Sequence, residues 1–379
     1  MKLDRIYNLA DMREAARRRV PKGIFQFIDR GAEDDEAIAN NREAFRRLKL
    51  VPQVMVDATS CSTQSMVFGK PQAMPLAIAP TGAAGLVCFK GELQLARAAA
   101  KAGIPFTLAT RSMDSIEEIA EAGGTLWFQL YLWKDRAKTY KLLERVSAAG
   151  IDVLMVTLDV PVEPNREFNR RNGFTFPFSW SLRSAWDMAL RPFWLLNVIG
   201  RYQLSTGLPD YSGVPPLAGD ITLDDIRELR KRWRGTLLVK GVLRPEDARR
   251  AVACGADGVI VSNHGGRCLD AVVATMDALP AIVDAVGRSA TVLVDSGIRR
   301  GTDVVKALSL GASAVLSGRP CLYGLAVAGQ SGAERVLSML QRELLIAMAQ
   351  VGCTSTRDLG PHIVHGALPE HQVAVGGAN

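Results

Sequence analysis

Eight short apolar runs alternate with helix-like stretches over most of this 379-residue chain, and this alternation limits the possible folds more than any other feature. The runs are nearly continuously hydrophobic, which is typical of strands buried on both faces of a parallel sheet. Helix-like stretches such as 92–103 and 136–150 lie between them and end in a small residue followed by glycine, the usual signal of a helix end. The predicted strands span residues 74–80, 105–110, 125–131, 152–159, 236–242, 258–263, 290–296 and 313–318.

Eight strands alternating with helices predict a (β/α)8 TIM barrel, with a doubly wound open sheet as the alternative. We expect a single domain over residues 1–379, with the barrel at about 74–352. Residues 1–73 are expected to form short helices and a hairpin that cover the bottom or the flank of the barrel. Residues 160–220 show no strand or helix repeat, so we expect a long loop after the fourth strand, on the carboxyl-terminal face where barrel active sites lie.

Charge and cysteine content exclude several classes of protein. The 46 Lys and Arg residues exceed the 39 Asp and Glu residues, an excess that allows an anionic ligand or an acidic membrane surface but does not predict nucleic-acid binding. The six cysteines are scattered without a CxxC pair, so neither a disulfide framework nor a zinc ribbon is expected. Because the first residues are charged and no run of 18 apolar residues occurs, we expect a cytoplasmic protein without a signal peptide or a spanning helix.

Polar or charged residues lie at the ends of the third to eighth predicted strands. Such groups are costly to bury unless they pair or bind a ligand, so a ring of them at the carboxyl-terminal face predicts a functional site. The ring contains Gln129, Tyr131, Thr157, Asp159, Arg166, Lys240, Ser262, His264, Arg267, Asp295, Arg299, Gly318 and Arg319.

His264 is the only histidine at the end of a predicted strand, because the other three lie in the carboxyl-terminal tail. A lone histidine is most often structural, but Gly265 and Gly266 open the backbone beside this one, which favours a general base. The pair His362 and His365 has a metal-like spacing but no cysteine or carboxylate cluster beside it. No metal site is therefore expected.

The turns after the seventh and eighth strands predict a phosphate site, because each glycine-containing turn opens a helix. Arg299 and Arg319 would add charge-assisted hydrogen bonds to the phosphate. The alternative is two ordinary turns with solvated arginines. Lys240, at the end of the fifth strand, allows two interpretations: a lysine that forms a Schiff base, or a cation that stabilises negative charge on a bound ring.

Taken together, these motifs resemble the FMN-dependent α-hydroxy acid dehydrogenases and oxidases, a family that includes glycolate oxidase, L-lactate dehydrogenase and mandelate dehydrogenase. The strings that carry the resemblance are VIVSNHGGRCLD (259–270), LLVKGV (237–242), WFQLY (127–131), DSGIRRGTDVVKAL (295–308) and GAED (31–34). The resemblance covers the chain from Pro21 to about Gly352 and implies a homotetramer with FMN at the carboxyl-terminal face, where Lys240 is the cation beside the flavin. It assigns to FMN the residues Pro80, Thr81, Gly82, Gln129, Thr157, Lys240, Ser262, Asp295, Ser296, Gly297, Ile298, Arg299, Gly318 and Arg319.

The same resemblance implies roles for the residues around the substrate. His264 would take the proton of the substrate hydroxyl group, and Asp159 would pair with the imidazolium that forms. Arg267 and Arg166 would hold the substrate carboxylate, for which arginine is better suited than lysine. Tyr131 would form a hydrogen bond with the substrate oxygen.

Four positions depart from the family pattern. Phe27 replaces a tyrosine that helps to bind the carboxylate, and Ala109 replaces a serine that commonly contacts the flavin. Arg111 stands where a pocket aromatic or small residue is often found, and we expect it to contact the substrate. Cys268 replaces the usual glutamine. These departures affect the choice of substrate rather than the type of reaction.

We therefore expect FMN-dependent oxidation of an (S)-2-hydroxy acid, L-lactate-like or larger, to the 2-oxo acid. The alternatives are an oxidase that makes hydrogen peroxide, a flavin-free phosphate-binding isomerase or aldolase that uses Lys240, and a non-catalytic binding protein. Gly82 stands where oxidases often have alanine, which favours a quinone or another carrier as electron acceptor. The aromatic and basic segment 178–212 is expected either to bind the inner face of the membrane or to serve as a substrate lid or oligomer contact.

Overall fold

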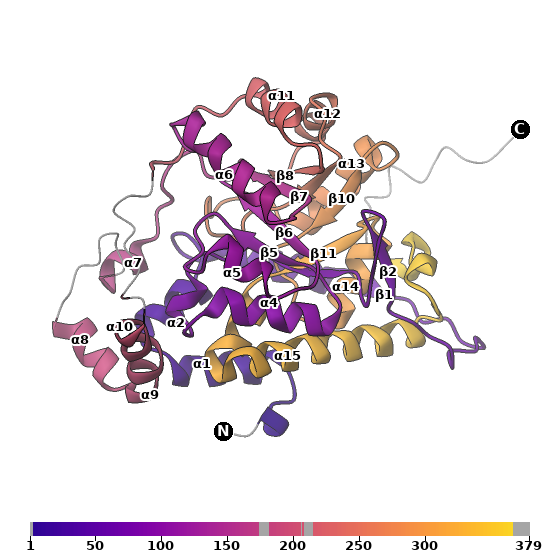
Figure 1. Cartoon of the computed structure of the whole chain (residues 1–379). Helices are drawn as coiled ribbons and strands as arrows, with labels where there is room; N and C mark the ends of the chain where they lie inside the picture. Colours follow the sequence, from indigo (N-terminus) through magenta and orange to yellow (C-terminus); the bar gives the residue numbers. More distant parts are fainter. Residues whose placement is uncertain (1–2, 174–181, 206, 208–214, 367–379) are drawn as a thin grey trace, which may run out of the picture.

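In the computed structural model, eight parallel strands close into a barrel at the centre of the molecule (Figure 1). The structure describes residues 3–173, 182–205, 207 and 215–366. Because β11 pairs with β4, the sheet closes, and the predicted barrel is confirmed over the open-sheet alternative. The strands are β4 (Leu76–Ile78), β5 (Phe106–Ala109), β6 (Leu126–Leu130), β7 (Val153–Thr157), β8 (Thr236–Val242), β9 (Gly258–Val261), β10 (Thr291–Val294) and β11 (Ala314–Ser317), each within one predicted run.

One principal helix follows each strand and packs outside the barrel (Figure 1). These helices are α4 (Gly91–Ala102), α5 (Ile116–Ala120), α6 (Arg136–Ala148), α11 (Leu223–Arg232), α12 (Pro245–Ala253), α13 (Thr275–Val286), α14 (Gly301–Ser309) and α15 (Arg319–Gln350), the last interrupted at Ala328 and Gly329. The glycines predicted to follow helices, Gly103, Gly150, Gly255 and Gly311, all have φ between +65° and +97°, which confirms them as left-handed helix ends.

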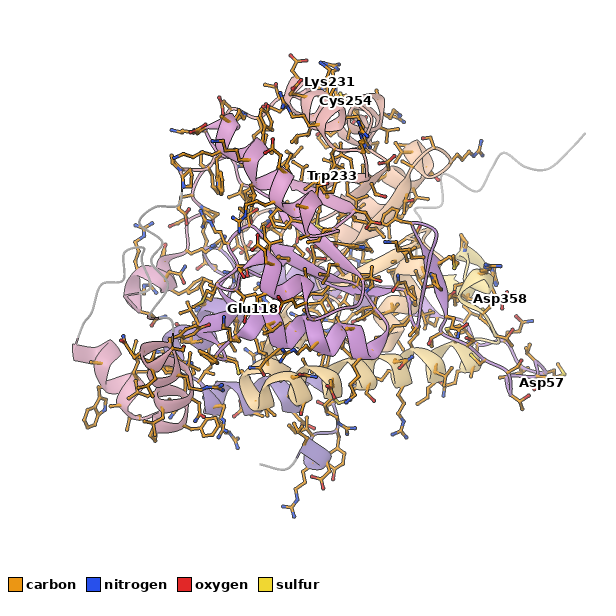
Figure 2. The ribbon with its side chains drawn as sticks, in the orientation of Figure 1. Asp57, Glu118, Lys231, Trp233, Cys254 and Asp358 are labelled. Carbon is orange, nitrogen blue, oxygen red and sulfur yellow. The ribbon has the colours of Figure 1, made fainter. Side chains whose placement is uncertain are left out.

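A hairpin closes the amino-terminal end of the barrel, opposite the predicted site. It consists of β2 (Ser65–Val67) and β3 (Lys70–Gln72). Val67 joins the cluster of side chains inside the barrel, and the ring of Phe68 packs edge-on to Trp127 with centroids 5.7 Å apart. Since Trp127 is the second residue of β6, the hairpin plugs the bottom of the barrel, as predicted. Figure 2 shows Asp57 on the loop before the hairpin, where this loop projects from the molecule.

The amino-terminal helices cover more of the barrel than its bottom and flank. They are α1 (Leu9–Arg19), α2 (Lys22–Asp29) and α3 (Glu36–Arg47), preceded by the short η1 (Leu3–Arg5). Helix α1 packs along α15, and α3 packs against α13, so both lie on the flank. Helix α2 ends at the carboxyl-terminal face, where Arg267 and Arg319 bond its last carbonyl groups. After α3, β1 (Lys49–Leu50) pairs with β12 (Val364–His365), which follows η4 (Thr356–Asp358) and η5 (Pro361–Ile363).

The prediction of a segment without helices over residues 160–220 is wrong. The structure has α7 (Glu167–Arg171), α8 (Leu182–Ala189), α9 (Pro192–Trp194), the π-helical η3 (Leu195–Gly200) and α10 (Arg201–Leu204). Trp194, Val198 and Tyr202 are buried at a spacing of four, so this part of the chain has one inward stripe. Large apolar side chains also point to solvent here, and this obscured the helical pattern. Residues 174–181, 206 and 208–214, including Trp180, lie outside the described residues.

Candidate active site

A cavity of about 1070 Å³ opens at the carboxyl-terminal ends of the barrel strands. Asp159 and Ser262 are not among its lining residues, but they contact His264 and Lys240 directly. All other predicted site residues line it: Pro80, Thr81, Gly82, Arg111, Gln129, Tyr131, Thr157, Arg166, Lys240, His264, Arg267, Asp295, Ser296, Gly297, Ile298, Arg299, Gly318 and Arg319. The sequence therefore located both the wall of the cavity and two residues behind it.

His264 is held by an unusual backbone conformation just after β9. Its φ is +58°, and Gly265 and Gly266 continue in the left-handed region at +67° and +71°. Such a conformation costs free energy for a residue with a side chain, so the surrounding contacts must fix it. The imidazole Nδ1 lies 2.8 Å from Asp159 Oδ1, and Nε2 lies 3.2 Å from the Tyr131 hydroxyl group. With Nδ1 facing a carboxylate, Nε2 is left to exchange a proton on the cavity side.

The charges around His264 stabilise its protonated form. Burial opposes that charge, but the Asp159 carboxylate outweighs it and raises the pKa of His264 to about 10. Burial alone would raise the pKa of Asp159, but the charges of His264 and Lys240 hold it below its usual range. The pair is therefore suited to holding a proton taken from a ligand.

Lys240 is a buried cation on the cavity wall. The β8–β9 register shifts between Lys240 and Val242, and Gly241 in this bulge has φ +98°. A Cβ atom at Gly241 would lie 2.6 Å from the Cβ of Asp159, so the close approach requires glycine. Lys240 Nζ lies 2.7 Å from Ser262 Oγ and 3.2 Å from Asp295 Oδ2.

The protonation of Lys240 decides between its two predicted roles. Burial opposes its charge, but Asp295 and Asp159 outweigh it, so the pKa of the ammonium group lies above its ordinary value. A Schiff-base lysine must lose its proton near neutral pH. The geometry therefore favours the cationic role.

The loops after β10 and β11 form an end of the cavity that suits an anion. Ser296 and Gly297 have φ of +73° and +99°, and α15 begins at Arg319. Arg319 donates to the carbonyl group of Asp29 at 3.0 Å. Burial and the neighbouring charge of Arg299 lower the pKa of Arg319 to about 10. The positive charges of Arg299 and Arg319 repel each other, and a phosphate group between them would offset this repulsion.

The two arginines predicted to bind a carboxylate line the same cavity, and Arg267 shares the Arg30 carbonyl group with Arg319. Arg267 donates to the carbonyl groups of Phe27 and Arg30 at 2.7 and 3.0 Å, and its guanidinium carbon lies 5.3 Å from the Phe27 ring centroid. Arg166 Nε donates to the Arg267 carbonyl group at 3.0 Å. Burial, followed by the charges of Arg166 and Arg319, lowers the pKa of Arg267 well below the ordinary value for arginine. An anionic ligand would relieve this repulsion.

Sequence reasoning missed the residues that fix the loop after β9. Asp270 accepts hydrogen bonds from the backbone N–H groups of Asp34, Glu36 and Ala37 at 2.9–3.1 Å, which anchors this loop to the start of α3. Asn263 forms reciprocal amide hydrogen bonds with Asn41. Asp270 and Asn263 both lie in the string that carried the family resemblance, so their position beside His264 was the available signal.

A buried lysine, a group of arginines and a histidine paired with a carboxylate share one barrel cavity, an arrangement that suits a cofactor with a reacting centre beside it. The family model described as FMN-dependent dehydrogenase matches residues 16–366, and the chain belongs to this family. FMN is therefore its cofactor, and the protein is an oxidoreductase of the hydroxy acid dehydrogenase and oxidase class.

Individual relatives agree with this membership. L-lactate dehydrogenase of Caulobacter vibrioides is 40% identical over 378 residues, which cover 96% of this chain and 99% of that protein. L-lactate oxidase of a Nostoc species is 43% identical over 363 residues, which cover 94% and 98% of the two chains. The crystal structure of the monotopic membrane protein (S)-mandelate dehydrogenase aligns with a TM-score of 0.90 at 39% identity, covering 96% of this chain and all of that one. The resemblance predicted from the sequence is confirmed.

The residues present in the cavity fit FMN. Thr81 Oγ1 is buried without a hydrogen-bond partner among the described residues, so it can donate to a bound molecule. Arg299 and Arg319 lie at the anion-binding end, where they can bind the phosphate group. Lys240 supplies positive charge on the wall between Ser262 and Asp295. The cavity volume of about 1070 Å³ lies slightly above the usual range of about 300–1,000 Å³ for one small-molecule ligand, which leaves room for a cofactor and a small substrate.

Proposed function

We propose that this protein oxidises an (S)-2-hydroxy acid to the corresponding 2-oxo acid, with His264 as the base. The observation that carries the proposal is the array of Asp159, His264 and Tyr131, whose successive contacts measure 2.8 and 3.2 Å on the wall of the cavity. Bound FMN supplies the two-electron acceptor for the hydrogen that leaves the substrate carbon.

In this mechanism the residues of the chain bind the substrate and move its proton. Arg267 and Arg166 bind the α-carboxylate, and Tyr131 donates a hydrogen bond to the substrate oxygen. His264 takes the hydroxyl proton at Nε2, and Asp159 stabilises the imidazolium that results. Lys240 would help to hold the cofactor, and its positive charge would stabilise the negative charge that reduction adds.

The proposed substrate is larger or more polar than glycolate. Phe27 lacks the tyrosine hydroxyl group usual in the family, a loss of roughly 1.5–3 kcal/mol for a hydrogen bond to a charged group. Arg111 lines the same cavity, with its guanidinium carbon 6.0 Å from the centroid of the Tyr131 ring. Glu163 also lines the cavity. These charged groups favour a substrate with a polar side chain over the smallest 2-hydroxy acids.

The proposal is tested by measuring flavin reduction without oxygen, using a panel of 2-hydroxy acids. We expect faster reduction by the larger or more polar members than by glycolate. His264→Gln should retain bound FMN but slow flavin reduction at least about 10²-fold, the lower range for loss of a general base. Near-normal reduction in this variant would overturn the role of His264.

We propose a quinone or another carrier as the electron acceptor, rather than oxygen. The proposal is supported by Gly82, which stands where oxidases of the family often have alanine. A Cβ atom at this position would lie 3.1 Å from the Cβ of Arg111. After reduction by substrate, the enzyme should be reoxidised more slowly by air than by a soluble quinone analogue. Faster reoxidation by air, with formation of hydrogen peroxide, would support the oxidase alternative.

We also propose that helices α8 to α10 bind a membrane surface. Trp186, Phe193 and Leu196 are 69%, 51% and 69% exposed, although large apolar side chains are normally buried. The guanidinium group of Arg19 lies 3.3 Å from the centroid of the Phe193 ring, so positive charge borders the apolar surface. Basic and aromatic residues together suit an anionic membrane interface. No helix among the described residues is both long and apolar enough to cross a membrane.

A further inference from the structure

Cys268 lies beside the proposed catalytic pair. Asp159 follows β7, whereas His264 and Cys268 follow β9. Only β8 separates these two strands in the barrel, so their carboxyl ends bring the three residues together. Each offers one atom that can ligate a metal ion, and these atoms lie within 4.8 Å of one another. This is the one such group found in the part of the chain that the structure describes.

We propose that Asp159, His264 and Cys268 bind a Zn²⁺ ion, which reversibly blocks the enzyme. A thiolate, an imidazole and a carboxylate are all established zinc ligands, and three protein ligands leave a fourth tetrahedral position for water. Magnesium and calcium prefer oxygen ligands, so a site with sulfur and nitrogen selects against them. The blocking effect rests on the proposed role of His264, whereas the binding itself does not.

A carboxylate oxygen of Asp159 is available for the ion. Oδ1 contacts His264 Nδ1, but Oδ2 is buried and has no hydrogen-bond partner among the described residues. A buried carboxylate oxygen without a partner is costly, and a cation would satisfy it. Asp159 Oδ2 therefore favours the binding of a cation or a hydrogen-bond donor.

The charge balance also permits a divalent ion. Zinc ligation displaces the proton of the Cys268 thiol and the extra proton that His264 holds, so two protons pass to solvent, and Cys268 and Asp159 together contribute two negative charges. Lys240 and Arg267 lie nearby and oppose a cation. Lys240 is paired with Asp295 at 3.2 Å, which reduces its effect on the site. Arg267 is the remaining opposing charge, so we expect a reversible site rather than a permanently filled one.

Zinc at this position would stop His264 from acting as a base. A neutral imidazole has only one nitrogen with a free lone pair, and its other nitrogen carries a proton. Once that lone pair is donated to the metal, neither nitrogen can accept the substrate proton. His264 lines the open cavity and Cys268 is partly exposed, so an ion has a path from solvent.

The test uses the purified holoenzyme after treatment with EDTA and removal of the chelator. Zinc binding is measured by competition with a chromophoric chelator, and anaerobic flavin reduction by substrate is measured in the same samples. We expect one zinc ion per chain, a parallel loss of flavin reduction, and full recovery on adding EDTA. Magnesium chloride at the same concentrations should have no effect.

Cys268→Gln restores the residue usual in the family and removes one ligand, so it should weaken zinc binding at least tenfold. Cys268→Ser provides a second, smaller replacement. The matched control is Cys61→Gln, at a partly exposed cysteine outside the cavity, which should bind zinc as the unmodified enzyme does. The inhibition of each variant is expressed relative to its own metal-free rate.

Two results would overturn the proposal. If both Cys268 variants bind zinc as tightly as the unmodified enzyme, the three residues do not form the site. If binding depends on Cys268 but flavin reduction is unaffected, zinc does not block the enzyme. The chelator competition does not depend on turnover, so it distinguishes these failures from a failure of the proposed reaction, which metal-free His264→Gln tests separately.

Discussion

The backbone conformation of His264 is specified by the residues next to it in the sequence, whereas its side-chain partners Asp159 and Tyr131 come from other strands. The glycines that follow it allow the left-handed turn, and Ser262 Oγ accepts the His264 N–H at 3.0 Å. This much could be predicted from the string around His264, as could Lys240 and Arg267 at the strand ends. The carbonyl groups of α2 that hold Arg267 could not be predicted, because backbone acceptors carry no residue-type signal.

At the residue scale, the charge of Asp159 should set the pH dependence of flavin reduction. His264 must be neutral to accept a proton. Burial lowers the pKa of His264, but the charge of Asp159 outweighs burial and raises that pKa to about 10. The rate at low substrate concentration should therefore rise with pH through the neutral range and level off near that pKa. Asp159→Asn removes the charge, so the rise should move to lower pH while the maximum rate falls.

Stopped-flow measurements of anaerobic flavin reduction between pH 6 and 10, with EDTA present, check this expectation. Glu163→Gln is the matched control, because it removes an exposed carboxylate that lines the same cavity without touching His264. A rise that stays at the same pH in Asp159→Asn would show that another group controls the rate.

At the scale of elements, strands were easier to predict than the helices after the fourth strand. Each barrel strand is buried on both faces and therefore gives an unbroken apolar run. Helices α8 to α10 have buried residues on one face and exposed apolar residues such as Trp186 and Leu196 on the other. Two apolar faces erase the periodicity on which a helix prediction depends.

The loops after β4 and β5 are joined by a buried carboxyl group on α4, which gives a second prediction. Glu92 Oε1 accepts the backbone N–H groups of Ala84 and Met113 at 2.8 and 3.2 Å. Burial and then the charge of Asp114 raise the pKa of Glu92 to about 8. The folded protein thus holds a proton that the unfolded chain releases near its ordinary pKa. Stability should fall as pH rises from the ordinary pKa of glutamate to about 8, by on the order of 5 kcal/mol in all.

Glu92→Gln keeps the acceptor oxygen but cannot ionise. The variant should therefore not show this loss of folding stability between about pH 5 and 8. Urea unfolding at pH 5.5, 7 and 8.5 measures the difference between the two proteins. Glu118→Gln is a suitable control, since Glu118 (labelled in Figure 2) lies on α5, is partly exposed and pairs with Lys90 at 2.6 Å. An equal pH dependence in the Glu92→Gln variant would show that this carboxyl group is ionised throughout.

At the scale of the whole molecule, helices α8 to α10, which carry the exposed apolar side chains, lie on the same side as α1 and α2 (Figure 1). Lys22 N–H donates to Asp187 at 2.6 Å, and Arg191 donates to the Val20 carbonyl group, which fixes α8 and α9 against α2. Helix α2 also reaches the cavity through Phe27. A membrane bound at this surface would therefore lie close to the entrance through which a quinone could approach.

The final prediction tests this arrangement by flotation with anionic liposomes. Changing Trp186, Phe193 and Leu196 together to serine removes large exposed apolar groups, each worth roughly 1.5–3 kcal/mol when fully buried. The ratio of membrane-bound to free protein should fall at least about tenfold. Val54→Ser with Met55→Ser is the control, because these residues are 71% and 100% exposed on the loop that carries Asp57. Figure 2 labels Asp57 at the lower right, whereas Figure 1 labels α8 at the left in the same orientation. If the triple variant, or a protein lacking residues 178–212, floats as well as the intact chain, this surface is not the membrane contact and a lid or subunit contact becomes the better interpretation.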